Sequence, residues 1–207
     1  MLALSNARVL TDDGFVDGRV VLIEGARIVA LTNAQDPRCA GATRRDLGGA
    51  SLLPGFIDCQ VNGGGGVLFN DDPSVDSIRR IGAAHRRFGT TGFLPTLISD
   101  DLSVIASAID AVRHAIDERV PGVIGVHIEG PFINALRKGA HDPAKFRDLD
   151  GEGVALLSSL GVGRTLVTLA PELTTPATIR MLVSAGVVVS AGHTNGTFDE
   201  VRDAFLH

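Results

Sequence analysis

Tryptophan and tyrosine are absent from this 207-residue chain, and cysteine occurs twice, at Cys39 and Cys59. Without those two aromatic residues, a sugar ligand cannot be held by stacking on Trp or Tyr rings. Two cysteines are too few for a disulfide framework and lack the spacing of a metal-binding pair. No segment approaches the roughly 20 apolar residues that span a bilayer. Residues 1–8 also lack the basic start and apolar run of a signal peptide. These absences predict a cytoplasmic protein with no membrane contact.

Excess positive charge is also missing, since the formal net charge is −5. Because no basic cluster offsets this balance, a nucleic-acid partner is not expected. Hydrophobic residues make up 44% and charged residues 21% of the chain, close to the averages of globular proteins. The composition therefore predicts a folded protein and excludes extensive disorder.

The first part of the chain, residues 1–54, has the pattern of short β-strands. Strands are predicted around residues 9–10, 19–23 and 27–31, separated by Asp-Gly and Glu-Gly turn signals. Strands this close together indicate antiparallel meanders. Residues 33–49 are polar and rich in Gly and Ala, and they are predicted to form a loop. Because this part is too small for a large core, we expect it to pack against another element.

From residue 55 onward the pattern changes to alternating strands and helices. Strands are predicted at residues 56–61, 92–98, 123–128, 165–169 and 187–191. The intervening helices are expected to begin at Asp72-Pro73, to bury a stripe from Ile105 to Ile116, and to begin again at Thr175-Pro176 and at a Thr197 capping box. This alternation predicts an α/β fold with a parallel sheet and right-handed crossovers.

Two architectures fit such a sheet: a doubly wound open sheet and a (β/α) barrel. In the third strand His127 and Glu129 share one face, opposite Ile128, and in the first strand Gln60 shares a face with Asp58. Polar side chains gathered on one face near the carboxyl ends of strands favour the barrel. A complete barrel has eight strands and about 250 residues. We therefore predict an incomplete TIM-like barrel of about five strands in residues 55–207.

Two of the predicted strands each end in a potential metal ligand. The apolar run before Glu129 stops at Gly-Pro, and the run before His193 stops at Ala-Gly. A carboxylate and an imidazole on neighbouring strand ends can hold a divalent cation, which can activate water for hydrolysis. Glu129 and His193 are the predicted ligands. A buried histidine is most often a hydrogen-bonded core residue, so His127 is expected to support the ligands without binding the ion.

Three other segments leave their roles open. The run Asn62 to Gly66 fits a phosphate-binding loop or a flexible connector. The loop from Arg137 to His141 fits capture of an anionic group or a solvated charged loop. Glu172 ends the fourth predicted strand in a carboxylate to which the pattern assigns no role.

Taken together, these segments resemble the N-acetylglucosamine-6-phosphate deacetylases of the amidohydrolase superfamily. The matching segments run in family order: LPGFID at 53–58, QVNG at 60–63, HIEGPF at 127–132, KGAH at 138–141, LAPE at 169–172 and SAGHT at 190–194. The resemblance implies a small β-sandwich portion, residues 1–54, joined to a metal-dependent barrel, residues 55–207, in a homodimer. It implies removal of the acetyl group from N-acetylglucosamine 6-phosphate, giving glucosamine 6-phosphate and acetate.

The resemblance also implies roles for individual residues. Glu129 and His193 would bind one divalent ion, zinc in the first place and otherwise iron or another divalent metal. Gln60, Ala140 and His141 would contact the sugar phosphate. Because Gln60 and Asn62 stand where many amidohydrolases have His-x-His, a mononuclear site is expected. The family's third metal ligand and its catalytic aspartate, which would exchange protons with the water and the amine, are expected beyond His207.

The chain is thus expected to be the N-terminal portion of the enzyme and to be inactive when isolated. Two alternatives remain open at this point. One is another mononuclear amidohydrolase, such as a deaminase or a dihydroorotase-like enzyme. The other is a non-catalytic fragment that binds a sugar phosphate.

Overall fold

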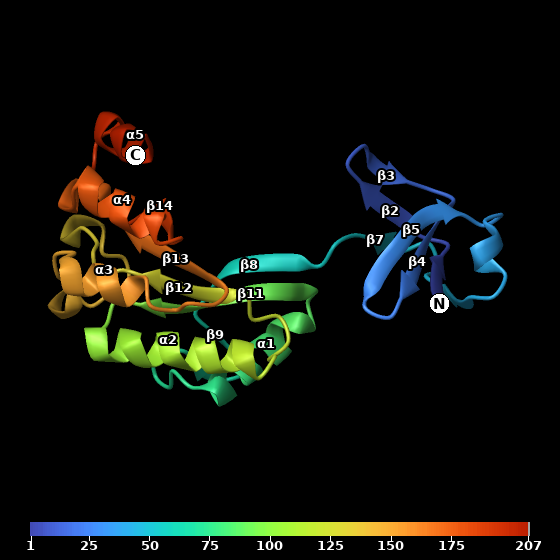
Figure 1. Ribbon diagram of the computed structural model, residues 1–207, viewed down its shortest axis with the longest axis horizontal. Helices are drawn as coiled ribbons and strands as arrows, with labels where there is room; N and C mark the ends of the chain where they lie inside the picture. Colours follow the sequence, from blue (N-terminus) through green and yellow to red (C-terminus); the bar gives the residue numbers. More distant parts are fainter. Residues whose placement is uncertain (207) are drawn as a thin grey trace. The chain divides into compact units, whose positions relative to one another are not determined.

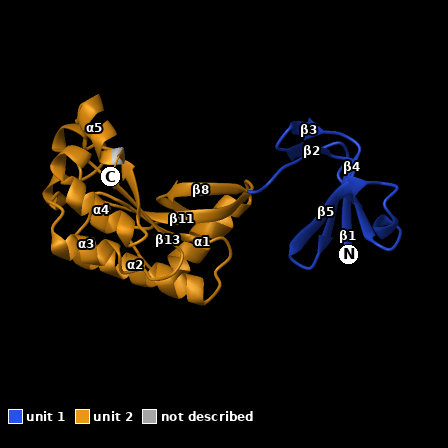
Figure 2. Cartoon of the chain, turned by 45° about the horizontal axis from the view of Figure 1, so that its top comes forward, with its two compact units in different colours: residues 1–55 blue, residues 56–207 orange. Residues whose placement is uncertain are grey.

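The computed structural model describes residues 1–206 of the chain (Figure 1). The chain divides into two compact units, Met1–Gly55 and Phe56–His207, which are coloured separately in Figure 2. Each unit has buried apolar residues of its own. Within residues 1–206, no helix has both the length and the apolar character needed to cross a membrane.

The first unit consists of two small β-sheets. Their strands are β1 (Leu2–Ser5), β2 (Arg8–Thr11), β3 (Gly14–Val16), β4 (Arg19–Glu24), β5 (Arg27–Asn33), β6 (Thr43–Asp46) and β7 (Ser51–Leu52). One sheet has the order β5-β4-β1-β6 and the other β3-β2-β7. The β2–β3 and β4–β5 pairs are antiparallel, as the turn signals predict. Apolar side chains from β1 and β4, including Ala3 and Leu22, are buried in this unit.

The prediction of a loop over residues 33–49 is wrong in part. Residues Pro37–Cys39 form the 3-10 helix η1, and Thr43–Asp46 form strand β6. All four residues of β6 are exposed, and the strand is held by parallel pairing with β1. Its backbone hydrogen bonds do not depend on side-chain type, so the polar sequence Thr-Arg-Arg-Asp gave no sign of a strand.

The second unit contains a curled parallel sheet of five strands, forming half a barrel. The strands are β8 (Phe56–Val61), β11 (Thr90–Ile98), β12 (Gly125–Glu129), β13 (Arg164–Leu169) and β14 (Val188–Ala191). Every neighbouring pair is parallel, and the spatial order follows the order along the chain. In a doubly wound sheet, the order in which strands are added along the chain reverses at a switch point. In a barrel, each new strand is added beside the previous one. The structure therefore confirms the predicted half-barrel.

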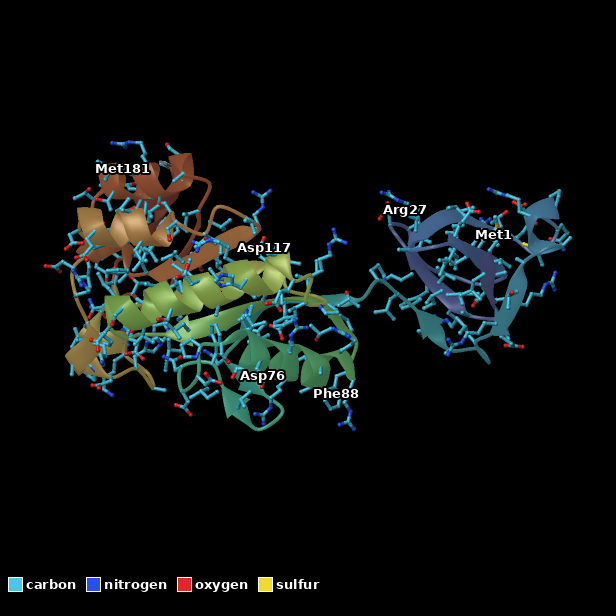
Figure 3. All side chains as sticks on the ribbon, turned by 60° about the horizontal axis from the view of Figure 1, so that its bottom comes forward. Met1, Arg27, Asp76, Phe88, Asp117 and Met181 are labelled. Carbon is cyan, nitrogen blue, oxygen red and sulfur yellow. The ribbon has the colours of Figure 1, made fainter. Side chains whose placement is uncertain are left out.

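Helices and short turns connect the strands of this sheet. They are α1 (Val75–Arg86), α2 (Leu102–Asp117), α3 (Gly151–Leu157), α4 (Pro176–Ser184), α5 (Phe198–Phe205), η2 (Ala135–Arg137), η3 (Pro143–Lys145) and η4 (Pro171–Leu173). Figure 1 shows α1 and α2, in green, along one side of the sheet, and Figure 3 labels Asp76 in the first turn of α1 and Asp117 at the end of α2. The predicted stripe of α2 packs inward, with Ile105, Ile109 and Val112 at most 1% exposed.

One helical prediction needs correction, and one helix was not predicted. Helix α1 is capped by Ser74, whose hydroxyl accepts the backbone N–H of Ser77, and does not begin at Asp72-Pro73. Asp72 instead accepts hydrogen bonds from the hydroxyls of Ser74 and Ser77, which secures the turn before the helix. Helix α3 was not predicted because it has only seven residues, two of them glycines, and glycine disfavours helix.

The glycine run after β8 forms an ordered hairpin between β9 (Gly63–Gly64) and β10 (Val67–Leu68). A side chain at Gly63 would place its Cβ 2.4 Å from the carbonyl oxygen of Val67, so the close approach of the two strands requires glycine there. The ring of His85 on α1 also contacts the carbonyl oxygen of Gly63, Nε2 to O being 2.9 Å. The flexible-connector interpretation of this run is therefore not supported.

Strands β8 and β14 are the two edges of the half-barrel. Each is the outermost strand on one side of the sheet, and each carries exposed apolar side chains. Ile57 is 66% exposed on β8, and Val188 is 50% exposed on β14. In the interior strands between them, Val126 and Val167 are fully buried. The apolar surface of the sheet is therefore covered in the middle and open at both edges.

Candidate metal centre

Glu129 is the last residue of β12, and its side chain is largely buried. The residue is 7% exposed. The next residue, Gly130, has φ of +76°, and a Cβ there would lie 2.3 Å from the Ser99 hydroxyl oxygen. Glycine accommodates both demands. The Glu-Gly sequence thus ends the strand sharply and leaves the carboxylate at its carboxyl end.

His193 lies two residues after β14, and its ring faces Glu129. Its Nδ1 lies 2.8 Å from the carbonyl oxygen of Arg137. Because a carbonyl oxygen can only accept a hydrogen bond, Nδ1 must carry a proton. The second ring nitrogen, Nε2, lies 3.1 Å from Oε1 of Glu129. In the neutral ring, Nε2 therefore presents its lone pair to the carboxylate.

This pairing of Glu129 with His193 fits a bound cation. A lone pair and a carboxylate oxygen repel each other unless a proton or a metal cation lies between them. Zn²⁺ binds imidazole nitrogen and carboxylate oxygen at about 2.0–2.2 Å, so adjacent tetrahedral ligand atoms lie roughly 3.3 Å apart. The observed 3.1 Å between Nε2 and Oε1 is close to that separation. The donor set therefore suits a divalent ion held by imidazole and carboxylate.

His141 adds a third polar group to this cluster. Its Nε2 lies 4.0 Å from Oε2 of Glu129, and its ring centroid lies 4.6 Å from that of His193. One ligand atom from each of the three residues fits within 4.8 Å of the other two. However, the backbone N–H of Ser99 donates to Nδ1 of His141 at 3.3 Å, and the Ser99 hydroxyl lies 2.7 Å from the same nitrogen.

The Ser99 contacts determine which nitrogen of His141 carries the proton. Since a backbone N–H can only donate, Nδ1 must accept, and the proton of the neutral ring is on Nε2. Burial lowers the pKa of His141, and the nearby His193 ring lowers it further while Glu129 opposes the shift. The neutral ring therefore points an N–H donor into the pocket. This geometry suits hydrogen bonding to a ligand better than metal coordination.

Gln60 completes the surroundings of the carboxylate. Its side-chain N–H donates to Oε2 of Glu129 at 2.8 Å, leaving Oε1 to face His193. Gln60, Glu129, Ala140, His141 and His193 all line one open cavity of about 380 Å³. The structure thus brings together five of the six residues singled out from the sequence as candidates.

His127 is the candidate that lies outside this cavity lining. It is 2% exposed, and its Nε2 and Nδ1 lie 2.8 Å and 3.2 Å from the hydroxyls of Thr168 and Thr96. Among the described residues, no hydrogen bond joins its ring to Glu129, His141 or His193. Burial lowers the pKa of His127, although the Glu129 carboxylate acts in the opposite direction. The ring therefore links β12 to its two neighbouring strands.

Sequence reasoning missed the contribution of Ser99. It follows the last residue of β11, is 6% exposed, and contacts His141 at a separation of 42 residues. Its place directly after a buried strand end was the available signal. A lone serine at such a position carries no pattern that distinguishes it from a capping or turn residue.

Comparisons with known proteins agree with this geometry. Residues 51–207 match the amidohydrolase family. An N-acetylgalactosamine-6-phosphate deacetylase from a Shewanella species is 40% identical over 205 residues, covering 99% of this chain and 52% of the relative. An N-acetylglucosamine-6-phosphate deacetylase from Haemophilus influenzae is 34% identical, covering 98% of this chain and 53% of the relative.

A solved structure also resembles the whole chain. The crystal structure of N-acetylglucosamine-6-phosphate deacetylase from Pasteurella multocida superposes with a TM-score of 0.92 at 32% identity. The match covers 99% of this chain and 54% of that one. The chain therefore spans about half the length of the curated and solved relatives that it matches.

Proposed function

Because this chain belongs to the amidohydrolase family, we propose that it forms the metal-binding half of a deacetylase for an N-acetylated amino-sugar 6-phosphate. One observation carries the proposal: Nε2 of His193 faces Oε1 of Glu129 at 3.1 Å, while Nδ1 is committed to the Arg137 carbonyl. This arrangement on strand ends of a half-barrel is suited to a divalent ion, and an imidazole and a carboxylate are ligands that zinc accepts. The two compact units are proposed to be a β-sandwich portion and a barrel portion.

A divalent ion bound between Glu129 and His193 would polarise an amide carbonyl and lower the pKa of a water molecule. The chain's own residues orient the carboxylate and offer a hydrogen-bond donor in this pocket. Gln60 holds Glu129 in orientation through the hydrogen bond to Oε2. His141 presents Nε2–H to the cavity, where it can donate to an oxygen of the sugar or of its acetamide. Ala140 lines the same cavity.

The resemblance implies an aspartate that takes a proton from water and returns it to the departing amine. Of the described residues lining the cavity, Glu129 is the one carboxylate, and its oxygens are already occupied by Gln60 and His193. We propose that the proton acceptor belongs to the half of the relatives' length that this chain does not span. We propose that the enzyme is a homodimer, as the resemblance implies, and that it is cytoplasmic, as the sequence predicts.

Two substrates are candidates. N-acetylglucosamine 6-phosphate is the first, because most of the relatives are named as deacetylases of this sugar phosphate. N-acetylgalactosamine 6-phosphate is the second, because the Shewanella relative at 40% identity is named for it. The two sugars differ only in the configuration of one hydroxyl group.

Ion binding by the chain provides the first test. Titration with Co²⁺, followed by its visible absorption, is expected to show one ion per chain. His193→Asn and Glu129→Ala should abolish this signal, whereas His114→Asn, which alters an exposed histidine on α2, should leave it unchanged. Equal binding by the wild-type chain and His193→Asn would contradict the proposed centre.

Acetate release provides the second test. The chain alone is expected to release no acetate from either sugar phosphate. A chimaera in which residues 1–207 replace the matching half of the Haemophilus influenzae relative should release acetate, and His193→Asn in that chimaera should not. Turnover by the chain alone would overturn the assignment of the proton acceptor to the other half. Deamination or ring opening of cyclic substrates without acetate release would favour another amidohydrolase.

A further inference from the structure

Glu172 is a carboxylate close to the candidate metal centre. It is neither one of the two predicted metal ligands nor one of the residues that line the cavity. It lies in η4, directly after β13. Three donors converge on it: the Asn134 side-chain amide and the Asn195 backbone N–H reach Oε1 at 3.0 Å and 2.7 Å, and the Thr194 hydroxyl reaches Oε2 at 2.5 Å. A carboxylate that receives three donors from two separate loops can join them firmly.

The donors that Glu172 binds either follow His193 directly in the chain or contact its backbone. Thr194 and Asn195 are the next two residues of the chain, so their hydrogen bonds hold the backbone immediately after the ring. Asn134 holds the ring's own residue, because its backbone N–H donates to the carbonyl oxygen of His193 at 3.0 Å. Glu172 therefore connects the loop after β12 to the segment that directly follows His193 in the loop after β14.

The backbone of His193 needs such support. Its φ is +49°, in the left-handed region that residues with a side chain seldom adopt. A residue of this kind keeps its conformation only where its surroundings enforce it. Glycine at position 196 leaves room for this arrangement, since a Cβ there would lie 3.1 Å from Oε2 of Glu172 and 3.0 Å from the Thr194 hydroxyl.

A second set of contacts follows from the same loop geometry. The Arg137 carbonyl oxygen accepts the hydrogen bond from Nδ1 of His193, and the Arg137 side chain donates from Nε to Oδ1 of Asn195 at 3.1 Å. Asn195 is in turn held by Glu172 through its backbone N–H. The residue that sets the direction of the His193 ring is thus tied to the segment that Glu172 holds.

We propose that Glu172 is a positioning residue that holds His193 so that Nε2 faces Glu129 and Nδ1 faces the Arg137 carbonyl. For its effect on an ion, this inference rests on the metal centre proposed above. The orientation of the ring itself does not depend on any ion. Glu172 acts through hydrogen-bond geometry, and its negative charge is secondary.

The role of geometry can be separated from the role of charge by two substitutions. In Glu172→Gln, the amide oxygen can still accept from Asn134 and Asn195, and the amide N–H can donate to Thr194 after its hydroxyl turns. Glu172→Ala removes all three contacts. Glu152→Ala is a matched control, because Glu152 is an exposed carboxylate in the first turn of α3.

The first measurement uses the 207-residue chain without metal. The ¹⁵N-labelled histidine ring of His193, identified by its loss in His193→Asn, should show an Nδ1–H proton protected from exchange by the Arg137 carbonyl. This protection should persist in Glu172→Gln and Glu152→Ala and be lost in Glu172→Ala. Circular dichroism establishes that each variant is folded. If Glu172→Ala does not fold, Thr194→Val, which removes one donor, should show a partial loss of protection.

The second measurement is Co²⁺ affinity of the same chain. Residues that support metal ligands change affinity by about 10- to 100-fold when replaced. We expect a loss in that range for Glu172→Ala and near wild-type affinity for Glu172→Gln and Glu152→Ala. A protected His193 ring in folded Glu172→Ala would overturn the inference, and so would a Glu172→Gln variant that behaves like Glu172→Ala. If Glu172→Ala loses ring protection while the wild-type chain binds no Co²⁺, the positioning role stands and the metal centre fails.

Discussion

Replacing Gly130 with alanine is expected to destabilise the second unit through two separable effects. The φ of +76° at this position costs an L-residue about 1–2 kcal/mol. The added Cβ would lie 2.3 Å from the Ser99 hydroxyl oxygen, and forcing such an overlap into a packed site costs about 1–3 kcal/mol. The sum predicts a loss of about 2–5 kcal/mol in the free energy of unfolding.

Removing the Ser99 hydroxyl separates the two effects. Ser99→Ala alone should cost about 0.5–1.5 kcal/mol, because the hydroxyl no longer contacts Nδ1 of His141. In Gly130→Ala/Ser99→Ala the overlap is relieved and the backbone strain remains. The double variant should therefore be less destabilised than the sum of the single variants, by about 1–3 kcal/mol.

Urea unfolding followed by far-ultraviolet circular dichroism is the appropriate assay. The chain has no Trp or Tyr for fluorescence, and the α-helices of the described residues all belong to the second unit, so the helical signal reports that unit. Gly151→Ala is the matched control, since a Cβ there meets nothing within 4 Å and the backbone is not left-handed. Additivity within about 0.5 kcal/mol, or a Gly130→Ala variant as stable as Gly151→Ala, would refute the steric argument.

Two further predictions concern the carboxylates. Gln60→Ala removes the N–H that orients Glu129 and should weaken Co²⁺ binding by about 10-fold, a smaller loss than in Glu129→Ala. The affinity is measured by competition with a chelator, and an unchanged affinity would contradict the orienting role. For Asp100, burial would raise the pKa, but the hydrogen bonds it accepts outweigh burial and lower it. Its stabilising contribution is thus present above the unfolded pKa of about 3.9 and is lost as the pH falls through the folded pKa, so acid unfolding curves of Asp100→Asn should show a shallower decline in that range than those of wild type.

Most of the architecture of the second unit could be predicted from the sequence. Apolar runs such as residues 165–169, bounded by glycine, proline and capping residues, predicted the five strands and the helices α1, α2, α4 and α5, but not α3. The alternation of side chains in β12 placed Glu129 on the barrel face, and the β-branched run before His193 placed that residue at the same sheet edge. The structure brings their side chains to 3.1 Å.

Other features could not be predicted because they depend on contacts between distant segments. Strand β6 is defined by backbone pairing with β1, and its side chains are polar and exposed. The proton position on His141 depends on Ser99, 42 residues away. Glu172 acquires its three donors only when the loops after three strands meet. Neither periodicity nor local motifs in the sequence indicate such contacts between distant segments.

Because the strands are paired in parallel with a regular register, residues that pair across neighbouring strands form aligned rows, each of which is called a rung. Glu129 pairs with Thr168, and Thr168 pairs with Ser190, so one rung crosses three strands that lie up to 61 residues apart in the chain. His193 follows that rung by three residues. Lengthening or shortening α3 or α4 on the outside of the sheet would leave this spacing unaltered, whereas a single-residue slip of β14 against β13 would carry the imidazole away from its carboxylate. Natural variation in this fold is therefore expected to accumulate as insertions in the crossovers, with strand lengths held constant.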